Sequence, residues 1–360
     1  MDCCCCRTDR RQFLKTSLAG GVAAVLGGSF PRVVRAADAV VSDAVRGKVA
    51  LTAGDDRADN VFQGMARFRD QILREIGDRR IVVKPNNVLV DKPLAATDAK
   101  CLEGILEFLK SIGKLKQAVI AESAGAGPTE EGFSNYGYYA VAKKYGVDLI
   151  DLDTQPTKVV YAFDQTDFAP HPVKVSEMLL DREQNYIISA AKLKTHDQVV
   201  ATLSLKNIVV GAPVKDVGFR FGKGRVPGTV SQKPITHGSG TYGINYNMFA
   251  LAQKLRPHLA VNDGYEGMEG NGPGWGEPVD HRVCVVSPDW LAADRVSVEL
   301  MGIDFAQIGY LNYCARAEMG EADMAKIEIL GEPVQRHVRK YRLHDKVEQQ
   351  LRWMNPPKLG

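Results

Sequence analysis

The sequence feature that most constrains the fold is a regular alternation of short apolar runs with longer amphipathic segments, from Gly47 to about Gly331. The apolar runs have the length of buried strands. The longer segments carry apolar residues at helical spacing; in the segment 58–76, for example, Val61 and Met65 fall on one face of a helix. Such an alternation is typical of an α/β protein. We therefore predict a largely parallel sheet flanked by helices.

The predicted elements cover most of this region. The strands are 49–52, 80–83, 117–121, 147–152, 185–193, 258–261, 282–286 and 326–330, and the helices are 58–76, 97–112, 138–145, 242–255 and 290–301. The middle of the chain is less regular. There, 159–163 and 173–175 are predicted as strands of a hairpin or edge insertion. Lys215–Ser239, rich in Gly, Lys, Arg and Pro, is predicted as a long surface loop of the kind that often carries function.

Length and composition limit the classes of protein. The 360 residues, 45% of them hydrophobic, are enough for one large domain or two smaller ones. Because no low-complexity linker interrupts the pattern, we expect a single α/β domain over residues 37–331 and a C-terminal tail over 332–360. The formal net charge of +3 is too small to indicate nucleic-acid binding, and no apolar run is long enough to span a bilayer.

The N-terminal segment has the features of an export signal. Residues 10–15, RRQFLK, form a twin-arginine signature, and a weakly apolar segment rich in Gly and Ala follows at 17–30. Val34-Arg35-Ala36 offers small residues for signal peptidase. The alternative, a membrane-anchoring helix, is less compatible with the glycines and with the short apolar run. We predict a signal peptide over residues 1–36, the twin-arginine export machinery as partner, and a periplasmic location.

The cysteines do not indicate a metal cluster. Cys3–Cys6 precede the paired arginines, in a segment that we expect to be removed or to lie upstream of the true start codon. The mature chain keeps Cys101, Cys284 and Cys314, which are far apart and lack the spacing of zinc or ferredoxin-type ligands. We therefore predict no intrinsic iron–sulfur cluster and interpret these cysteines as mainly buried apolar residues, with a disulfide left open.

Polar residues cluster where four predicted strands end. The clusters are Lys84-Asn86-Asn87, Glu122-Ser123, Lys192-Lys194-His196 and Asp263-Glu266-Glu269-Asn271. Each cluster alone is compatible with a polar turn. In an open α/β sheet, however, ligands bind outside the carboxyl ends of the strands, and right-handed crossovers bring those ends to one edge. We therefore expect Lys84, Lys194, His196 and Asp263 to line one cavity.

The stretch Ala190–Gly211 indicates an anion site at this edge. Its polar residues are Lys192, Lys194, Thr195, His196, Ser204, Lys206 and Asn207. Two lysines at alternate positions of a strand point the same way. Ammonium groups, a hydroxyl and the amides at a helix start all favour negative charge. A structural role for His196 is an open alternative; in a site, it would transfer protons or bind a metal.

A second informative stretch is the acidic glycine segment, Asp263–Gly276. Its glycines allow the backbone to approach a ligand closely, and its carboxylates suit a divalent cation or a proton-transfer role. It does not match the G-x-G-x-x-G pattern of dinucleotide-binding folds, because it carries acidic residues and no helix follows it directly. A flexible surface turn is the alternative. We predict Asp263 and Glu269 as ligands of a divalent metal.

These motifs together resemble the domain-of-unknown-function 362 family. The motifs are Lys84-Pro85-Asn86, Lys192-x-Lys194-Thr195-His196, Ser204-Leu205-Lys206-Asn207 to Gly211, and Asp263 through Glu269 to Pro273. The resemblance covers roughly 82–331 and implies a fold and a site. Many members of the family look as if they are joined to, or encoded with, ferredoxin-type iron–sulfur modules, but this chain has no Cys-x-x-Cys-x-x-Cys.

The first hypothesis for function is binding of a small anionic molecule, a carboxylate or phosphate, in a cleft lined by Lys, His and Asp, with a divalent metal as the only cofactor considered. The candidate catalytic residues are His196, Lys194 and Asp263. The candidate ligand-binding residues are Lys84, Asn86, Asn87, Lys192, Thr195, Lys206 and Asn207. Lysines gathered around one anion repel each other when the site is empty, so some should have depressed pKa values.

The second hypothesis is a non-enzymatic accessory or binding subunit of an exported iron–sulfur redox system, with a redox protein as partner. The twin-arginine signal and the resemblance to a family associated with iron–sulfur modules motivate it. A protein that only binds a partner does not need buried carboxylates facing lysines, so the acidic glycine segment distinguishes the two hypotheses.

The export prediction is testable with a conservative substitution. Replacing Arg10 and Arg11 with lysine keeps the charge and removes the twin-arginine signature, so we expect the precursor to stay in the cytoplasm. Immunoblots of cytoplasmic and periplasmic fractions measure this, and the wild-type chain, with a mature form that starts near Ala37, is the control. Normal export of the double-lysine variant would contradict the prediction.

Overall fold

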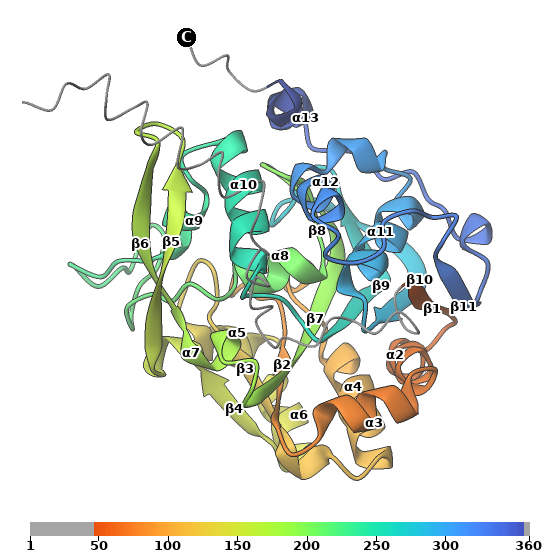
Figure 1. The fold of residues 1–360 in the computed structure, drawn as a ribbon. Helices are drawn as coiled ribbons and strands as arrows, with labels where there is room; N and C mark the ends of the chain where they lie inside the picture. Colours follow the sequence, from red (N-terminus) through yellow and green to blue (C-terminus); the bar gives the residue numbers. More distant parts are fainter. Residues whose placement is uncertain (1–46, 356–360) are drawn as a thin grey trace, which may run out of the picture. The chain divides into compact units, whose positions relative to one another are not determined.

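The central element of the fold is one large sheet (Figure 1). The computed structural model describes residues 47–355, so the predicted signal peptide, 1–36, lies outside the described residues, as do 37–46 and 356–360. Within residues 47–355, nine strands form this sheet in the order β11-β1-β10-β9-β7-β2-β3-β4, with β8 paired to β7. Its strands are β1 (Lys48–Ala53), β2 (Arg80–Lys84), β3 (Ala118–Glu122), β4 (Asp148–Asp151), β7 (Asn185–His196), β8 (Val200–Thr202), β9 (Leu259–Glu269), β10 (Glu277–Ser287) and β11 (Glu328–Gly331).

Most neighbouring strands run parallel. The strands β9, β7, β2, β3 and β4 are parallel in that order, and β1 is parallel to β11. β10 runs antiparallel to both of its neighbours, β1 and β9. Its direction relative to β9 follows from the short connection 270–276, because parallel neighbours need a long crossover. The predicted α/β fold with a largely parallel sheet is confirmed.

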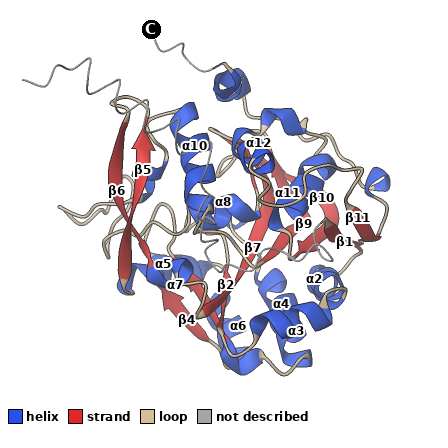
Figure 2. Ribbon diagram, in the orientation of Figure 1, coloured by secondary structure: helices blue, strands red, loops and turns tan. Residues whose placement is uncertain are grey.

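Helices cover both faces of the sheet (Figure 2). One face packs against α2 (Arg57–Ala66), α3 (Arg69–Ile76), α4 (Ala99–Ser111) and α6 (Tyr138–Tyr145), and the other against α8 (Ser204–Val209), α10 (Thr241–Ala252), α11 (Trp290–Leu300) and α12 (Gly309–Arg316). Shorter helices are α5 (Thr129–Asn135), α7 (Glu177–Leu180), α9 (Lys233–Thr236) and α13 (Val347–Gln350). Single 3₁₀ turns lie at Pro93–Ala95, Leu115–Gln117, Leu152–Thr154, Phe305–Gln307, Val334–Arg336 and Leu351–Met354.

The sheet separates two hydrophobic cores. Successive side chains of a strand point to opposite faces. In β2, Ile81 and Val83 belong to the core on the α4 side, whereas Val82 belongs to the core on the α11 side. In β7, Ile188 belongs to the core on the α4 side, and Ile187 belongs to the core on the α11 side. Because both faces are covered, these strands are continuous apolar runs, which is why the sequence revealed them.

The predicted helix 58–76 is two helices in the structure. α2 ends at Ala66 and α3 begins at Arg69, with the buried Phe68 in a non-helical conformation between them. The bend lets Met65 and Ile72 reach the same core. Helical spacing does not reveal such a bend, because both helices turn their apolar residues to the same side.

The first half of the acidic glycine segment is part of a β-strand. This corrects the sequence-based prediction, in which the strand ends at residue 261. β9 continues to Glu269 and pairs with β10 as far as Glu277. Its glycines make room for neighbouring side chains: a Cβ atom on Gly264 would lie 2.9 Å from a methyl carbon of Leu193, and one on Gly267 would overlap the Tyr341 hydroxyl. The glycines therefore serve packing within a strand, although glycines in a sequence usually indicate a turn.

The irregular middle of the chain has the expected form. β5 (Thr157–Asp164) and β6 (Ala169–Ser176) form a separate two-stranded antiparallel sheet, and Lys215–Ser239 is a long connection interrupted only by α9. The residues after Gly331 pack on the rest of the described chain: Tyr341 is buried against His281, and Trp353 donates a hydrogen bond to the Gln307 carbonyl. The domain limits 37–331 and 332–360 stay predictions. Among the described residues, no helix is both long and apolar enough to cross a membrane.

The contact between α2 and α4 gives a stability prediction. A Cβ atom on Gly104 would overlap the Ala58 carbonyl oxygen, so the two helices touch through this glycine. We expect Gly104→Ala to lower the free energy of unfolding by about 1–3 kcal/mol, because the helices must move apart. Urea unfolding measures the change. Lys110→Ala, at an exposed position of the same helix, is the control and should stay within about 0.5 kcal/mol of wild type; equal stability of Gly104→Ala and wild type would show that α4 has room to shift.

Candidate functional site

A cavity of about 440 Å³ opens beyond the carboxyl ends of β2, β3 and β7. Its polar lining consists of Lys84, Asn86, Asn87, Glu122, Ser123, His196, Asp197, Gln198, Thr202, Lys206, Lys233 and His237. Its apolar lining includes Val88, Leu89, Val210, Phe221, Pro273 and Trp275. These residues come from the ends of three neighbouring strands and the loops after them, from β8 and α8, from the long connection between α8 and α10, and from the connection between β9 and β10. The cavity thus lies where ligands bind in open α/β sheets.

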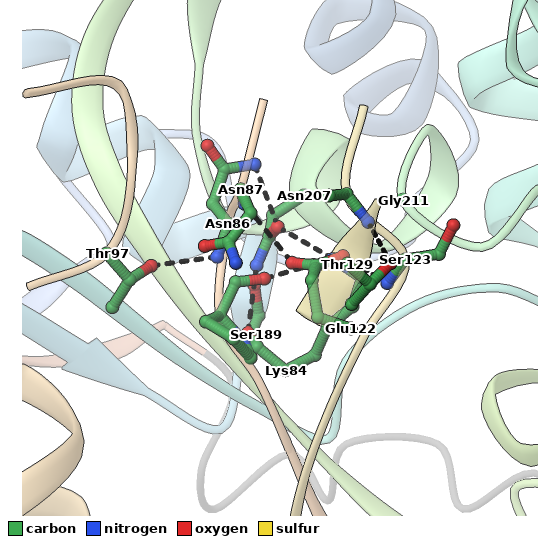
Figure 3. A network of polar contacts seen from close by, with 12 residues as sticks. Lys84, Asn86, Asn87, Thr97, Glu122, Ser123, Thr129, Ser189, Asn207 and Gly211 are labelled. Carbon is green, nitrogen blue, oxygen red and sulfur yellow. Dashed lines mark hydrogen bonds and ion pairs between the residues drawn. The ribbon is translucent and has the colours of Figure 1, made fainter. Parts of the chain in front are cut away.

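A buried ion pair forms the floor of the cavity (Figure 3). Lys84 ends β2 and Glu122 ends the adjacent parallel strand β3, so their side chains meet. The Lys84 Nζ atom lies 2.8 and 3.0 Å from the two carboxylate oxygens of Glu122, and both side chains are 1% exposed. Burial lowers the pKa of Lys84, and the Glu122 carboxylate opposes that change.

This pair organises the backbone and amides around it. The Glu122 carboxylate also accepts hydrogen bonds from the backbone N–H groups of Asn87 (3.2 Å) and Ser123 (2.7 Å). The Asn207 Oδ1 atom accepts from Lys84 Nζ (3.2 Å) and from Asn86 Nδ2 (3.0 Å). Asn207 therefore joins α8 to the end of β2, and hydrogen bonds within the protein occupy its side-chain amide.

Two features of the floor bear on ligand binding. A Cβ atom on Gly211 would overlap the Lys84 ammonium group, so only glycine allows α8 to end this close to the pair. One polar atom of each loop amide, Asn86 Oδ1 and Asn87 Nδ2, is buried without a hydrogen-bond partner among the described residues. Because buried polar atoms are normally paired, the two amides are incompletely satisfied in the protein alone.

Two further amines line the cavity, and no carboxylate of the described residues forms an ion pair with either of them. Lys206, in α8, is 6% exposed, and no described residue forms an ion pair or a hydrogen bond with its Nζ atom. Burial lowers the pKa of Lys206 to about 8, which the nearby Asp197 opposes. Lys233 Nζ donates to the carbonyl oxygens of Pro213 (2.7 Å) and Gly211 (3.1 Å), and burial lowers its pKa to about 7.

The nearest acid to Lys233 is already engaged. Asp153 forms an ion pair with Lys215, and both side chains are buried. Asp153 also accepts hydrogen bonds from the hydroxyls of Ser123 (2.6 Å) and Thr129 (2.9 Å). This second buried ion pair lies beside the cavity and anchors the beginning of the 215–239 connection.

Two histidines in the cavity have complementary roles. His196 Nδ1 accepts a hydrogen bond from the Gln198 N–H (3.0 Å) and also lies 3.1 Å from Asp197 Oδ1. We assign the proton of the neutral ring to Nε2, because the Gln198 N–H already occupies Nδ1. Burial and the positive charge of Lys206 hold the pKa of His196 well below its ordinary value. His237 Nδ1 lies 3.0 Å from the Lys233 carbonyl oxygen and donates to it, which leaves Nε2 as an acceptor; burial and Lys206 lower the pKa of His237 to about 4. At neutral pH one ring therefore donates and the other accepts.

Lys194 and Thr195 lie behind the cavity and do not line it. Lys194 Nζ is fully buried and donates to the Ala95 carbonyl oxygen (2.7 Å). Burial, with the positive charges of Lys206 and Lys192 next in importance, lowers the pKa of Lys194 far below its ordinary value. Thr195 Oγ1 donates to the Gly270 carbonyl oxygen (2.9 Å), so it ties β7 to the end of β9.

Asp263 and Glu269 also lie outside the cavity lining. Asp263 is buried, 3.4 Å from Arg57 Nε, and accepts from the Tyr265 N–H (3.0 Å). Burial raises the pKa of Asp263, and Arg57 and Lys192 oppose the rise. Glu269 accepts from the Arg342 N–H (3.0 Å).

The structure separates residues that the sequence predicted to share one cavity. The expectation that Lys84, Lys194, His196 and Asp263 line one cavity holds for Lys84 and His196 and fails for the other two. The reason is a shift in register: Lys192 pairs with Asp263, but Lys194 already pairs with Met268. Within residues 47–355, no group of three or more His, Cys, Asp or Glu side chains could hold a metal, and the metal role of Asp263 and Glu269 stays a prediction.

Sequence reasoning missed Lys233 and His237. Both lie in the segment 215–239, which has no periodicity and therefore gave no indication of what its side chains face. The available signal was an excess of basic over acidic residues in a long connection that follows the Lys206-Asn207 motif. Cys101, Cys284 and Cys314 are all buried free thiols, and burial raises the pKa of each.

The signal sequence, the sheet and the cavity beyond its strand ends together define an exported α/β protein. The chain belongs to the family of the Domain of unknown function (DUF362), whose model matches residues 81–299 and so spans all the elements around the cavity. A twin-arginine translocation pathway signal sequence matches residues 7–27 and directs export to the periplasm.

The chain is also similar to one curated protein over about two thirds of its length. The thylakoid-associated protein sll1697 of Synechocystis sp. (strain ATCC 27184 / PCC 6803 / Kazusa) is 24% identical over 237 residues, which are 64% of this chain and 65% of that protein. The chain therefore spans just under two thirds of the length of this relative.

The ion pair of Lys84 and Glu122 gives a double-mutant prediction. Glu122→Gln leaves the buried Lys84 without a charge partner, and we expect a loss of about 3–5 kcal/mol in the free energy of unfolding. Lys84→Met should cost a similar amount. The double variant Lys84→Met/Glu122→Gln should lose less than the sum of the two single losses, because it leaves no lone buried charge. Urea unfolding of the four proteins measures this, and additive losses would contradict a direct interaction.

Proposed function

We propose that this protein binds a small organic anion, a carboxylate or a phosphate, in the cavity beyond β2, β3 and β7. The observation that carries the proposal is Lys206, a buried amine that lines the cavity and has neither an ion pair nor a hydrogen bond among the described residues. A buried amine without a partner is costly unless a ligand completes it.

The charge balance of the cavity supports an anion as the ligand. Of the acidic residues that line it, Glu122 is neutralised by Lys84, and Asp197 lies at a partly exposed position. Lys206 and Lys233 thus contribute positive charge that no lining carboxylate balances through an ion pair. A carboxylate or phosphate accepts charge-assisted hydrogen bonds from such groups.

Neutral groups in the cavity would orient the ligand. His196 Nε2–H is a donor, and His237 Nε2 is an acceptor. The apolar lining, which includes Leu89 and Phe221, can accept a hydrocarbon portion. A mostly apolar pocket with a few converging polar groups is typical of small-molecule sites.

The proposal predicts a specific effect of Lys206. We expect Lys206→Met to weaken the binding of oxalate or inorganic phosphate by about 10- to 100-fold, because one charge-assisted hydrogen bond is lost. Isothermal titration calorimetry of the mature protein measures the affinity. Lys326→Met, which removes an exposed lysine before β11, is the matched control and should bind like wild type. Equal affinity of the Lys206→Met variant and wild type would exclude this cavity as the anion site.

The pH dependence follows from the pKa of Lys206, which is about 8 in the empty protein. Only the protonated amine attracts an anion, so the affinity should be highest below pH 8 and should fall above it, by up to about tenfold per pH unit. The binding of oxalate at pH 6 to 9 measures this dependence. An affinity that stays constant across this range would contradict a role for Lys206 as the binding cation.

A further inference from the structure

Lys206 differs from the other amines of the cavity in the number of hydrogen-bond partners of its Nζ atom. Lys84 Nζ contacts Glu122, Asn207 and the Pro85 carbonyl, and Lys233 Nζ is held by two backbone carbonyls. No described residue hydrogen bonds to Lys206 Nζ. A lysine amine that is desolvated and unbound is the kind of group that attacks carbonyl carbons in covalent catalysis.

The groups next to Lys206 suit this chemistry. His196 and His237 line the same cavity as Lys206, and its positive charge contributes to the lowered pKa of each ring. The Nε2–H of His196 can donate to an oxygen that develops negative charge. The Nε2 of His237 is free among the described residues to accept a proton.

We propose that the anion of this cavity is a small 2-oxo acid and that Lys206 Nζ forms an imine with its carbonyl carbon. This inference rests on the proposed anion-binding function. A 2-oxo acid has the two groups that the cavity provides for: a carboxylate, which favours the protonated form of Lys233 and accepts its third N–H, and an adjacent carbonyl, for Lys206.

The step balances without any further reactant. The neutral Nζ attacks the carbonyl carbon, the carbon–oxygen π pair moves to oxygen, and His196 Nε2–H stabilises that oxygen. His237 Nε2 takes a proton from the new ammonium centre and gives it to the oxygen, which forms a carbinolamine. The nitrogen lone pair then forms the second carbon–nitrogen bond as the carbon–oxygen bond breaks. The hydroxyl leaves as water with the last N–H proton of the nitrogen, which His237 Nε2 relays from nitrogen to oxygen. One amine and one carbonyl are consumed, and one imine and one water are formed.

The test is trapping of the imine on the intact mature protein. Glyoxylate and sodium cyanoborohydride convert an imine into a carboxymethyl-lysine, which peptide mass spectrometry locates. We expect Lys206 to be modified at least about tenfold faster than exposed lysines such as Lys100 and Lys326. Oxalate, which has the charge but no reactive carbonyl, should slow the modification of Lys206 and not that of Lys100.

Two outcomes would overturn the inference. Modification of Lys206 at the rate of the exposed lysines would show that it is not a nucleophile, and fast modification of Lys233 would show that the wrong amine was assigned. Lys206→Arg should abolish the fast phase of modification, whereas Lys326→Arg should keep it. Oxalate binding to the wild-type protein separates the two proposals: binding without trapping removes only the imine, and absence of both removes the anion site as well.

Discussion

The buried ion pair between Lys84 and Glu122 is the interaction on which the candidate site depends. It joins the ends of two neighbouring parallel strands, holds the backbone of Asn87, and, through Asn207, fixes the short helix α8 against the sheet. α8 in turn carries Lys206. The position of the Lys206 amine is therefore set by the neutralised pair of Lys84 and Glu122, and the close approach of α8 to this pair is possible because residue 211 is a glycine.

The charged groups of the cavity differ in how they are satisfied. Lys84 and Glu122 neutralise each other, and the same holds for Lys215 and Asp153 beside them. Lys206 and Lys233 have no ion pair with a carboxylate of the described residues. Such an arrangement reduces stability, and proteins tend to keep perturbed, unpartnered ionisable groups where a ligand uses them. This contrast is the reason why the proposed function assigns the anion to Lys206 and Lys233.

The sequence predicted the sheet and part of the site for a clear physical reason. Strands buried on both faces are continuous apolar runs, and parallel crossovers bring their carboxyl ends together, which placed Lys84, Asn86, Asn87, His196 and Lys206 correctly at one cavity. Lys194 and Asp263 were assigned to the same cavity because a change of strand register has no signal in the sequence. Lys233 and His237 were missed because long-range contacts, not local periodicity, determine where the segment 215–239 lies.

The cavity is built from parts of the chain as distant as Lys84 and His237, so it exists only after folding is complete. The twin-arginine pathway transports proteins that have already folded. This protein therefore passes through the membrane with the cavity assembled. Under the proposed function, an anion that bound in the cytoplasm would be transported with it. The solutes of the compartment where the chain folds, and not only those of the compartment where it resides, would then determine what the cavity holds on arrival.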